Sequence, residues 1–194
     1  MTTIIVAEDH GMVREGFKCL LCEDKNLKLV GEAEFSVQHD ASKPFRVHTT
    51  NGTVEDLGTE FMIDAYPENK AMNVVVASGK VALNGTALTR GQLGQLDRSG
   101  LVTVASNVDL ASWFGWTKGY VTFHDTPAVD AFIRLGRWYD LNFVLSDKSL
   151  NSLPLTASFR DESSSQVMKV LDLTLRMRHE VHGRTVTFYP VHTR

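Results

Sequence analysis

Two small groups of residues in this 194-residue chain have types and spacing that could support chemistry. Cys19 and Cys22 have the C-x-x-C spacing of redox and zinc sites, but no second Cys or His pair lies near them. His179-x-x-His182, with His192, suggests a metal site, yet acidic or Cys partners at ligand spacing are missing. Neither a phosphate-binding glycine loop nor a G-x-S-x-G motif occurs. The sequence therefore predicts no cofactor and no enzyme acting on an external substrate.

Composition narrows the class of protein further. The 20 Lys and Arg against 23 Asp and Glu give a net charge of −3, whereas binding to nucleic-acid phosphates depends on clustered positive charge. Apolar runs such as Val74 to Ala77 are far shorter than the roughly 20 residues needed to cross a bilayer. The run Ile4 to Ala7 follows no Lys or Arg and is not a secretory signal. As written, the chain is expected to be cytoplasmic and to bind no nucleic acid.

The elements that position these residues change character twice along the chain. Residues 1–33 predict a partial βαβ, with strands at Thr3 to Ala7 and Leu27 to Val30 around a helix. Residues 34–112 contain short β-type runs separated by turn signals and predict a β domain. Residues 113–194 predict the order β-α-β-β-α-β-β, with both helices on one face of a sheet. The expected fold class is mainly β followed by α+β.

The first segment carries one resemblance. Ile4 to His10, Val13 to Gly16 and Val30 to Ala33 resemble the start of response-regulator receiver domains. The resemblance implies that Glu8 and Asp9 hold Mg²⁺ beside an aspartate that accepts phosphate. Asp56 is the nearby acid for that role, although no apolar strand is predicted to deliver it.

The remainder of the chain carries a second resemblance, to the periplasmic part of FecR-family proteins. The residues that carry it are Gly31-Glu32-Ala33-x-Phe35, Pro44-Phe45, Leu57-Gly58-Thr59-x-Phe61 with Tyr66, Gly79-x-Val81, Gly91-Gln92, Val108-Asp109, Trp113, Gly119-x-Val121-x-Phe123 with Thr126-Pro127, Leu135-x-x-Trp138-Tyr139, and Phe159. This resemblance implies a β-rich FecR core followed by a module like the short signalling (STN) domains of secretins and TonB-dependent transducers. Together the two resemblances suggest a receiver start fused to a truncated FecR chain.

The FecR resemblance also implies a function. It implies a non-enzymatic signalling module whose partner is the signalling domain of a TonB-dependent outer-membrane transducer, with no small-molecule substrate. The family's inner-membrane anchor and the helices that bind its extracytoplasmic-function sigma factor are expected to be missing here, so sigma contact would need those regions. Two alternatives remain open: a cytoplasmic phosphoacceptor protein, and a degenerate fusion without activity.

Gly58 and Thr59 form the only pair for which the resemblance implies a reaction. Some FecR-type sensors cleave themselves at a Gly-Thr bond, where the hydroxyl attacks the preceding carbonyl in an N-to-O acyl shift. The simpler interpretation is that Gly58 supplies a bulge or a positive φ between two strands.

Partner contact is predicted at two places. Trp113, Trp116 and Tyr120 lie where the two FecR modules join, and they form either an interface or the packing between modules. An open sheet edge in the C-terminal module would accept an incoming strand. The residues chosen for that edge are Leu155, Thr156 and Phe159 in one strand, and Thr185, Thr187 and Tyr189 in another.

Overall fold

The computed structural model describes residues 2–6, 28–37, 45–56 and 58–191. The chain divides into two compact units, Met1–Thr117 and Lys118–Arg194. The boundary predicted from the sequence lies after residue 112. The boundary between the two compact units lies after Thr117, five residues later.

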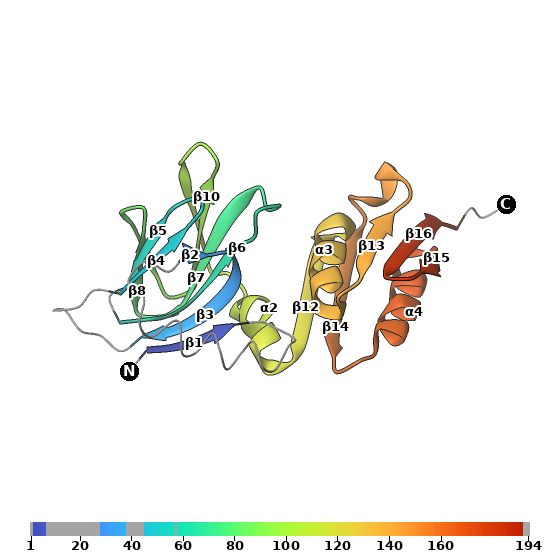
Figure 1. The fold of residues 1–194 in the computed structure, drawn as a ribbon, viewed down its shortest axis with the longest axis horizontal. Coiled ribbons are helices and arrows are strands. Elements are labelled where there is room, and N and C mark those ends of the chain that lie inside the picture. The colour runs from blue at the N-terminus through green and yellow to red at the C-terminus, as the bar shows by residue number, and fades with distance from the viewer. Residues whose placement is uncertain (1, 7–27, 38–44, 57, 192–194) are drawn as a thin grey trace. The chain divides into compact units, whose positions relative to one another are not determined.

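The first unit is built from two β-sheets (Figure 1). The larger sheet is antiparallel, and its strands in spatial order are β1 (Thr2–Val6), β3 (Gly31–Val37), β6 (Glu60–Ala65), β7 (Ala71–Ser78), β10 (Gln92–Asp97) and β11 (Val102–Ser106). The smaller sheet has the order β2 (Lys28–Leu29), β4 (Phe45–Thr49), β5 (Thr53–Asp56), β8 (Lys80–Leu83) and β9 (Thr86–Thr89). The β domain predicted from the spacing of turn signals is therefore present.

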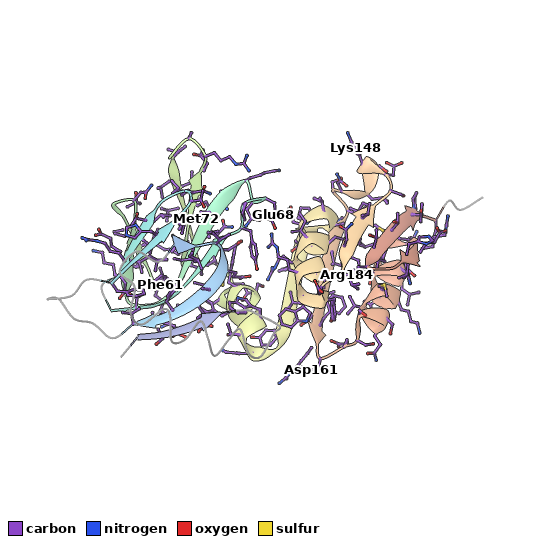
Figure 2. The ribbon with its side chains drawn as sticks, viewed as in Figure 1. Phe61, Glu68, Met72, Lys148, Asp161 and Arg184 are labelled. Atoms are coloured by element: carbon purple, nitrogen blue, oxygen red, sulfur yellow. The ribbon has the colours of Figure 1, made fainter. Side chains whose placement is uncertain are left out.

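The core of this unit collects apolar side chains from both sheets. Alternating burial along β5 and β8 directs Val54, Val81 and Leu83 inward, where they are fully buried. Phe61 and Met72 join them from the larger sheet (Figure 2). Each such side chain contributes about 1.5–3 kcal/mol by leaving water, so this shared core holds the two sheets together.

The predicted N-terminal βαβ fragment is not formed as a separate piece. β1 pairs antiparallel with β3 in the larger sheet, whereas β2 pairs in parallel with β4 in the smaller one. A βαβ unit would place its two strands in one parallel sheet. The expected helix between them lies outside the described residues. The first strand is therefore part of the β domain, at the edge of its larger sheet.

A short helical segment covers part of the outer face of the larger sheet. It consists of α2 (Leu110–Phe114) and the 3₁₀ turn η1 (Gly115–Lys118). The carboxylate of Asp109 accepts a hydrogen bond from the Ala111 amide (3.0 Å) and caps α2. Phe114 is buried against Met62 and Val75, which form a second apolar cluster on this face.

The second unit has the element order predicted from the sequence, divided over two small sheets. Strands β12 (Tyr120–Pro127) and β14 (Pro154–Arg160) form one antiparallel pair. Strands β13 (Asn142–Leu145), β16 (Thr185–Pro190) and β15 (Met177–His182) form the other sheet, in that order. The helices are α3 (Ala128–Tyr139) and α4 (Ser164–Leu175), and a 3₁₀ turn, η2 (Lys148–Leu150), precedes β14.

The prediction of a single sheet in this unit is wrong, because the strands form two sheets. α3 packs against β12 and β14 and also against β13, and α4 packs against β14 and β15, so each helix contacts both sheets. The reason is topological, because the chain returns from α3 to pair β13 in parallel with β16 instead of beside β12. One core joins both sheets and both helices, with Phe132, Phe143 and Phe188 in contact at centroid distances of 4.7 to 5.9 Å.

The helix starts show how local sequence sets these elements. α4 begins at a capping box, in which the Ser163 side chain accepts a bond from the Gln166 amide while the Gln166 side chain accepts from the Ser163 amide. The start of α3 differs, since Pro127 occupies the cap position and makes no side-chain bond. Instead, the Ala128 amide donates to the Leu153 carbonyl (2.8 Å), which joins α3 to the start of β14.

Candidate functional site

Strand β14 retains a free edge in the part of the chain that the structure describes. Its sheet has two strands, so the side of β14 away from β12 has no strand partner among those residues. Leu155 and Phe159 point into the core, at 0% and 3% exposure, whereas Thr156 is exposed. The predicted β14 residues therefore divide into two that hold the strand and one that is accessible.

The opposite edge of the same pair is already blocked. The β12–β14 register shifts between Phe123 and Thr126, and the Asp125 amide donates to the Thr156 hydroxyl there (2.9 Å). Asp125 has a positive φ of 50°, and Pro127 ends the strand. Bulges, charges and proline are the features that prevent strand addition, so β14 is the more accessible edge.

The second predicted edge strand is not an edge. β16 lies between β13 and β15, so its backbone is paired on both sides and cannot accept another strand. Thr185, Thr187 and Tyr189 alternate with the buried Val186 and Phe188, and all three are partly exposed. The prediction that these residues line an open edge is therefore wrong, because the sequence could not show that β13 pairs with β16.

Strand β15, one of the two edges of this sheet, is strongly charged. Arg178 donates to Glu180 (2.5 Å) and lies over the Tyr189 ring, 4.5 Å from its centroid. Chiefly because of the hydrogen bond from Arg178, the pKa of the Glu180 carboxyl is below its usual value. Charged side chains on an edge strand discourage pairing, so β15 is a poor acceptor for a partner strand.

Gly58 and Thr59 lie in a tight turn between β5 and β6. Gly58 has a φ of 94°, and a Cβ placed on Gly79 would lie 2.4 Å from the Gly58 carbonyl oxygen, so neither position tolerates a side chain easily. Thr59 is 3% exposed, and its hydroxyl donates to the Lys80 carbonyl (2.9 Å). The positive φ expected at Gly58 is thus observed, and the Thr59 hydroxyl is buried.

Asp56 is a buried acid next to this turn whose role there the sequence analysis missed. It is 3% exposed, and its Oδ2 atom accepts a hydrogen bond from the Gly58 amide (2.9 Å). Its Oδ1 atom is buried without a hydrogen-bond partner in the described structure. The spacing Asp-x-Gly could have indicated it, since an aspartate often accepts a bond from the amide two residues later. Its burial does not suit a residue that must accept phosphate from a donor in solution.

The aromatic residues near the predicted module boundary belong to different units. Trp116 lies in the first unit, where its indole N–H lies 3.2 Å from the Met62 sulfur. Trp113 packs against the same cluster on the outer face of the larger sheet. Tyr120 is the first residue of β12 in the second unit, and it is partly exposed. Trp113 and Trp116 therefore have a packing role within the first unit.

Several residues for which the sequence suggested a metal or redox site lie outside the described part of the chain. Glu8 and Asp9, the acids considered for Mg²⁺, lie outside the described residues, as do Cys19 and Cys22. Among the residues that are described, no three His, Cys, Asp or Glu side chains form a group that could bind a metal. In that same part of the chain, no helix has both the length and the apolar character required to span a membrane.

Comparison with known proteins defines the class of this two-unit, β-rich protein. Residues 23–82 match the family model described as FecR protein, and residues 120–188 match the model described as FecR, C-terminal. The first match begins inside the segment that resembled a receiver domain, and that receiver resemblance finds no support. The two matches, in chain order, assign the chain to the FecR family and support a role as a signal-transduction regulator.

Solved structures share the fold. Two crystal structures, at 1.65 and 2.50 Å resolution, are each described as that of "a putative anti-sigma factor from Parabacteroides distasonis ATCC 8503". The first has a TM-score of 0.75 and 24% identity, covering 85% of this chain and 80% of that chain. The second has a TM-score of 0.74 and 24% identity, covering 85% and 79%. No curated protein matches the chain.

Proposed function

We propose that this chain is the signal-receiving part of a FecR-type regulator, and that it binds the signalling domain of a TonB-dependent outer-membrane transducer. The single observation that carries the proposal is the accessible edge of β14 in the unit that matches the FecR C-terminal model. An incoming strand would satisfy backbone groups along that edge by β-augmentation.

The side chains of β14 fit this role. Pro154 begins the strand and Arg160 ends it, while the five residues between them carry no charge. The inward residues Leu155 and Phe159 anchor the strand in the core, so the edge is rigid before a partner arrives. A rigid edge lowers the entropy cost of binding, because the strand need not be ordered when the partner adds to it.

The family also implies a partner on the output side. Both solved structures that share the fold are described as "a putative anti-sigma factor", and we propose that this chain takes part in regulating an extracytoplasmic-function sigma factor. In this proposal the sigma factor contacts FecR-family regions other than the two units described here. The chain acts by binding proteins and not by catalysis on an external substrate.

The experiment is a calorimetric titration of the full chain with a purified transducer signalling domain. Thr156→Pro removes an amide and stiffens the exposed middle of β14, and we expect it to weaken binding at least about tenfold. Ala87→Pro, at an exposed position of edge strand β9 in the first unit, is the matched control and should bind like the wild type. Equal binding by wild type and Thr156→Pro, with both folded by circular dichroism, would contradict the proposed edge.

A second candidate activity, self-cleavage between Gly58 and Thr59, is favoured by the positive φ of Gly58, whose amide Asp56 holds next to the Thr59 hydroxyl that would attack. In this reaction the Thr59 Oγ1 atom bonds to the Gly58 carbonyl carbon, the amide C–N bond breaks, and the hydroxyl proton ends on the freed amine. Water then hydrolyses the ester and restores the Thr59 hydroxyl. Asp56 would act as a positioning residue, since it holds the Gly58 amide.

Intact-mass measurement tests this second activity. Cleavage predicts two fragments, residues 1–58 and 59–194, whose masses sum to that of the 21.6 kDa chain plus one water. Thr59→Ala should prevent cleavage and Thr59→Ser should retain it, because serine keeps the nucleophilic oxygen. A single full-length species that persists for days would rule out the reaction.

A further inference from the structure

Several edge strands of the two units are protected against pairing, although β14 is not. In the second unit, β12 has a bulge and a proline, and β15 carries charged residues. In the first unit, β9 has only four residues. Strand β11, which ends the larger sheet, has none of these protections in its sequence, because residues 99–108 contain neither a charge nor a proline.

β11 is also exposed on both of its faces. Four of its five residues are exposed, and Val104 retains 44% of its surface. Val104 lies opposite Gly94 of β10, which offers it no cross-strand side chain. The neighbouring Leu101 is 60% exposed. An uncharged edge with exposed β-branched and apolar residues is a typical strand-pairing surface.

The charge and symmetry of β11 favour a second copy of the same strand as its partner. If two β11 strands pair antiparallel about a two-fold axis at Val104, Val102 faces Ser106 of the other copy and Leu101 faces Asn107. No like charges meet in this register, and the two Val104 side chains cover each other. Such an interface is isologous and closes at two copies.

A foreign peptide fits this edge less well. Peptides that add to a sheet edge gain specificity from pockets for alternate side chains. β11 has exposed residues on both faces and would offer such a peptide little beyond main-chain hydrogen bonds. We therefore propose that this chain forms a homodimer by antiparallel pairing of β11 with β11 of a second copy, which joins two larger sheets into one.

The test measures the oligomeric state of the full chain by sedimentation velocity up to about 100 μM, a range that detects weak dimers. Wild type is expected to form a concentration-dependent dimer. Val104→Lys places two positive charges opposite each other, and Val104→Glu two negative ones, so each alone should weaken the dimer about tenfold or more. An equal mixture of the two variants should restore a dimer, because opposite charges then face each other.

Leu173→Lys is the control for this dimer test. Leu173→Lys makes the same kind of change at an 81% exposed position on α4 and should leave the dimer intact. Restored dimer in the mixture also shows that both Val104 variants are folded. A monomeric wild type, a dimer that tolerates Val104→Lys, a mixture that remains monomeric, or open-ended assembly instead of a dimer would each overturn the proposal.

Discussion

Strands β14 and β16 of the second unit have similar alternating sequences but different positions. Both direct alternate apolar side chains into the same core, with Leu155 and Phe159 from one and Val186 and Phe188 from the other. β16 is paired on both sides, whereas β14 is paired on one side only within the described structure. The alternation therefore determines which side chains are buried, while the position of a strand in its sheet decides whether its backbone can bind a partner.

The largest effect should come from proline at the central strand. Thr187→Pro removes a ladder hydrogen bond that β16 makes to a neighbour, and we expect a loss of about 4–5 kcal/mol. Thr156→Pro on the β14 edge should cost about 1 kcal/mol. Urea unfolding monitored by circular dichroism distinguishes the two, and equal losses would contradict the assignment of β16 as central and β14 as edge.

A second prediction concerns the core that the two strands share. Phe188→Ala and Phe159→Ala each remove a nearly fully buried ring and should each cost about 3–4 kcal/mol, despite the different positions of their strands. The same unfolding measurement applies to both variants. A much smaller loss for Phe159→Ala would show that β14 is held less firmly than its burial indicates.

The third prediction addresses the connection that follows β14. Ser163 caps α4 directly after the end of that strand, so Ser163→Ala should cost about 1 kcal/mol. Ser163→Asn keeps a capping side chain and should retain most of the stability. Thermal unfolding of the two variants measures the difference, and indistinguishable melting temperatures would argue against the capping box.

The smallest effect is a pH dependence at the same connection. Tyr139 donates to the Glu162 carbonyl (3.0 Å), and burial, with the nearby Glu162 and Asp161 carboxylates, raises the pKa of its hydroxyl above the usual 10. Above pH 10 the unfolded chain loses this proton before the folded chain does, so stability should fall as pH rises towards the folded-state pKa. Below pH 10 the group contributes no pH dependence.

Tyr139→Phe supplies the comparison for that measurement. Unfolding free energies between pH 8 and 11 should decline less steeply for the variant than for wild type. At pH 8 the variant loses only the hydrogen bond to Glu162, which is worth about 1 kcal/mol. Parallel curves from pH 10 upward would show that Tyr139 does not carry this dependence.

Much of the fold follows from local sequence. The short β-type runs separated by Asn51-Gly52, Ser78-Gly79 and Asn84-Gly85 indicate the β domain, and the change in period after Gly119 indicates the second unit. Strand pairing could not be predicted in the same way, because it depends on contacts far apart in the sequence. The parallel pairing of β13 with β16 and the antiparallel pairing of β1 with β3 are both of this kind.

In the candidate sites too, some features follow from local sequence and others depend on long-range strand pairing. The positive φ at Gly58 follows from its Leu-Gly-Thr context, and Asp56 two residues earlier carries a recognisable turn signal. The sequence could not predict that β14 is an edge strand and β16 a central one, since buried and exposed residues alternate in both. The sequence indicated that Trp113 and Trp116 contact another surface of the protein or of a partner. It could not show which surface, because the larger sheet that they cover is built from strands far from them in the sequence.

The most direct test of the proposed signal-receiving role is amide hydrogen exchange of the full chain with and without a transducer signalling domain. Strand addition predicts that amides along Pro154–Arg160 exchange more slowly in the complex, while those of the charged edge Met177–His182 are unchanged. Saturating binding without added protection in β14, or protection confined to β15, would contradict the account.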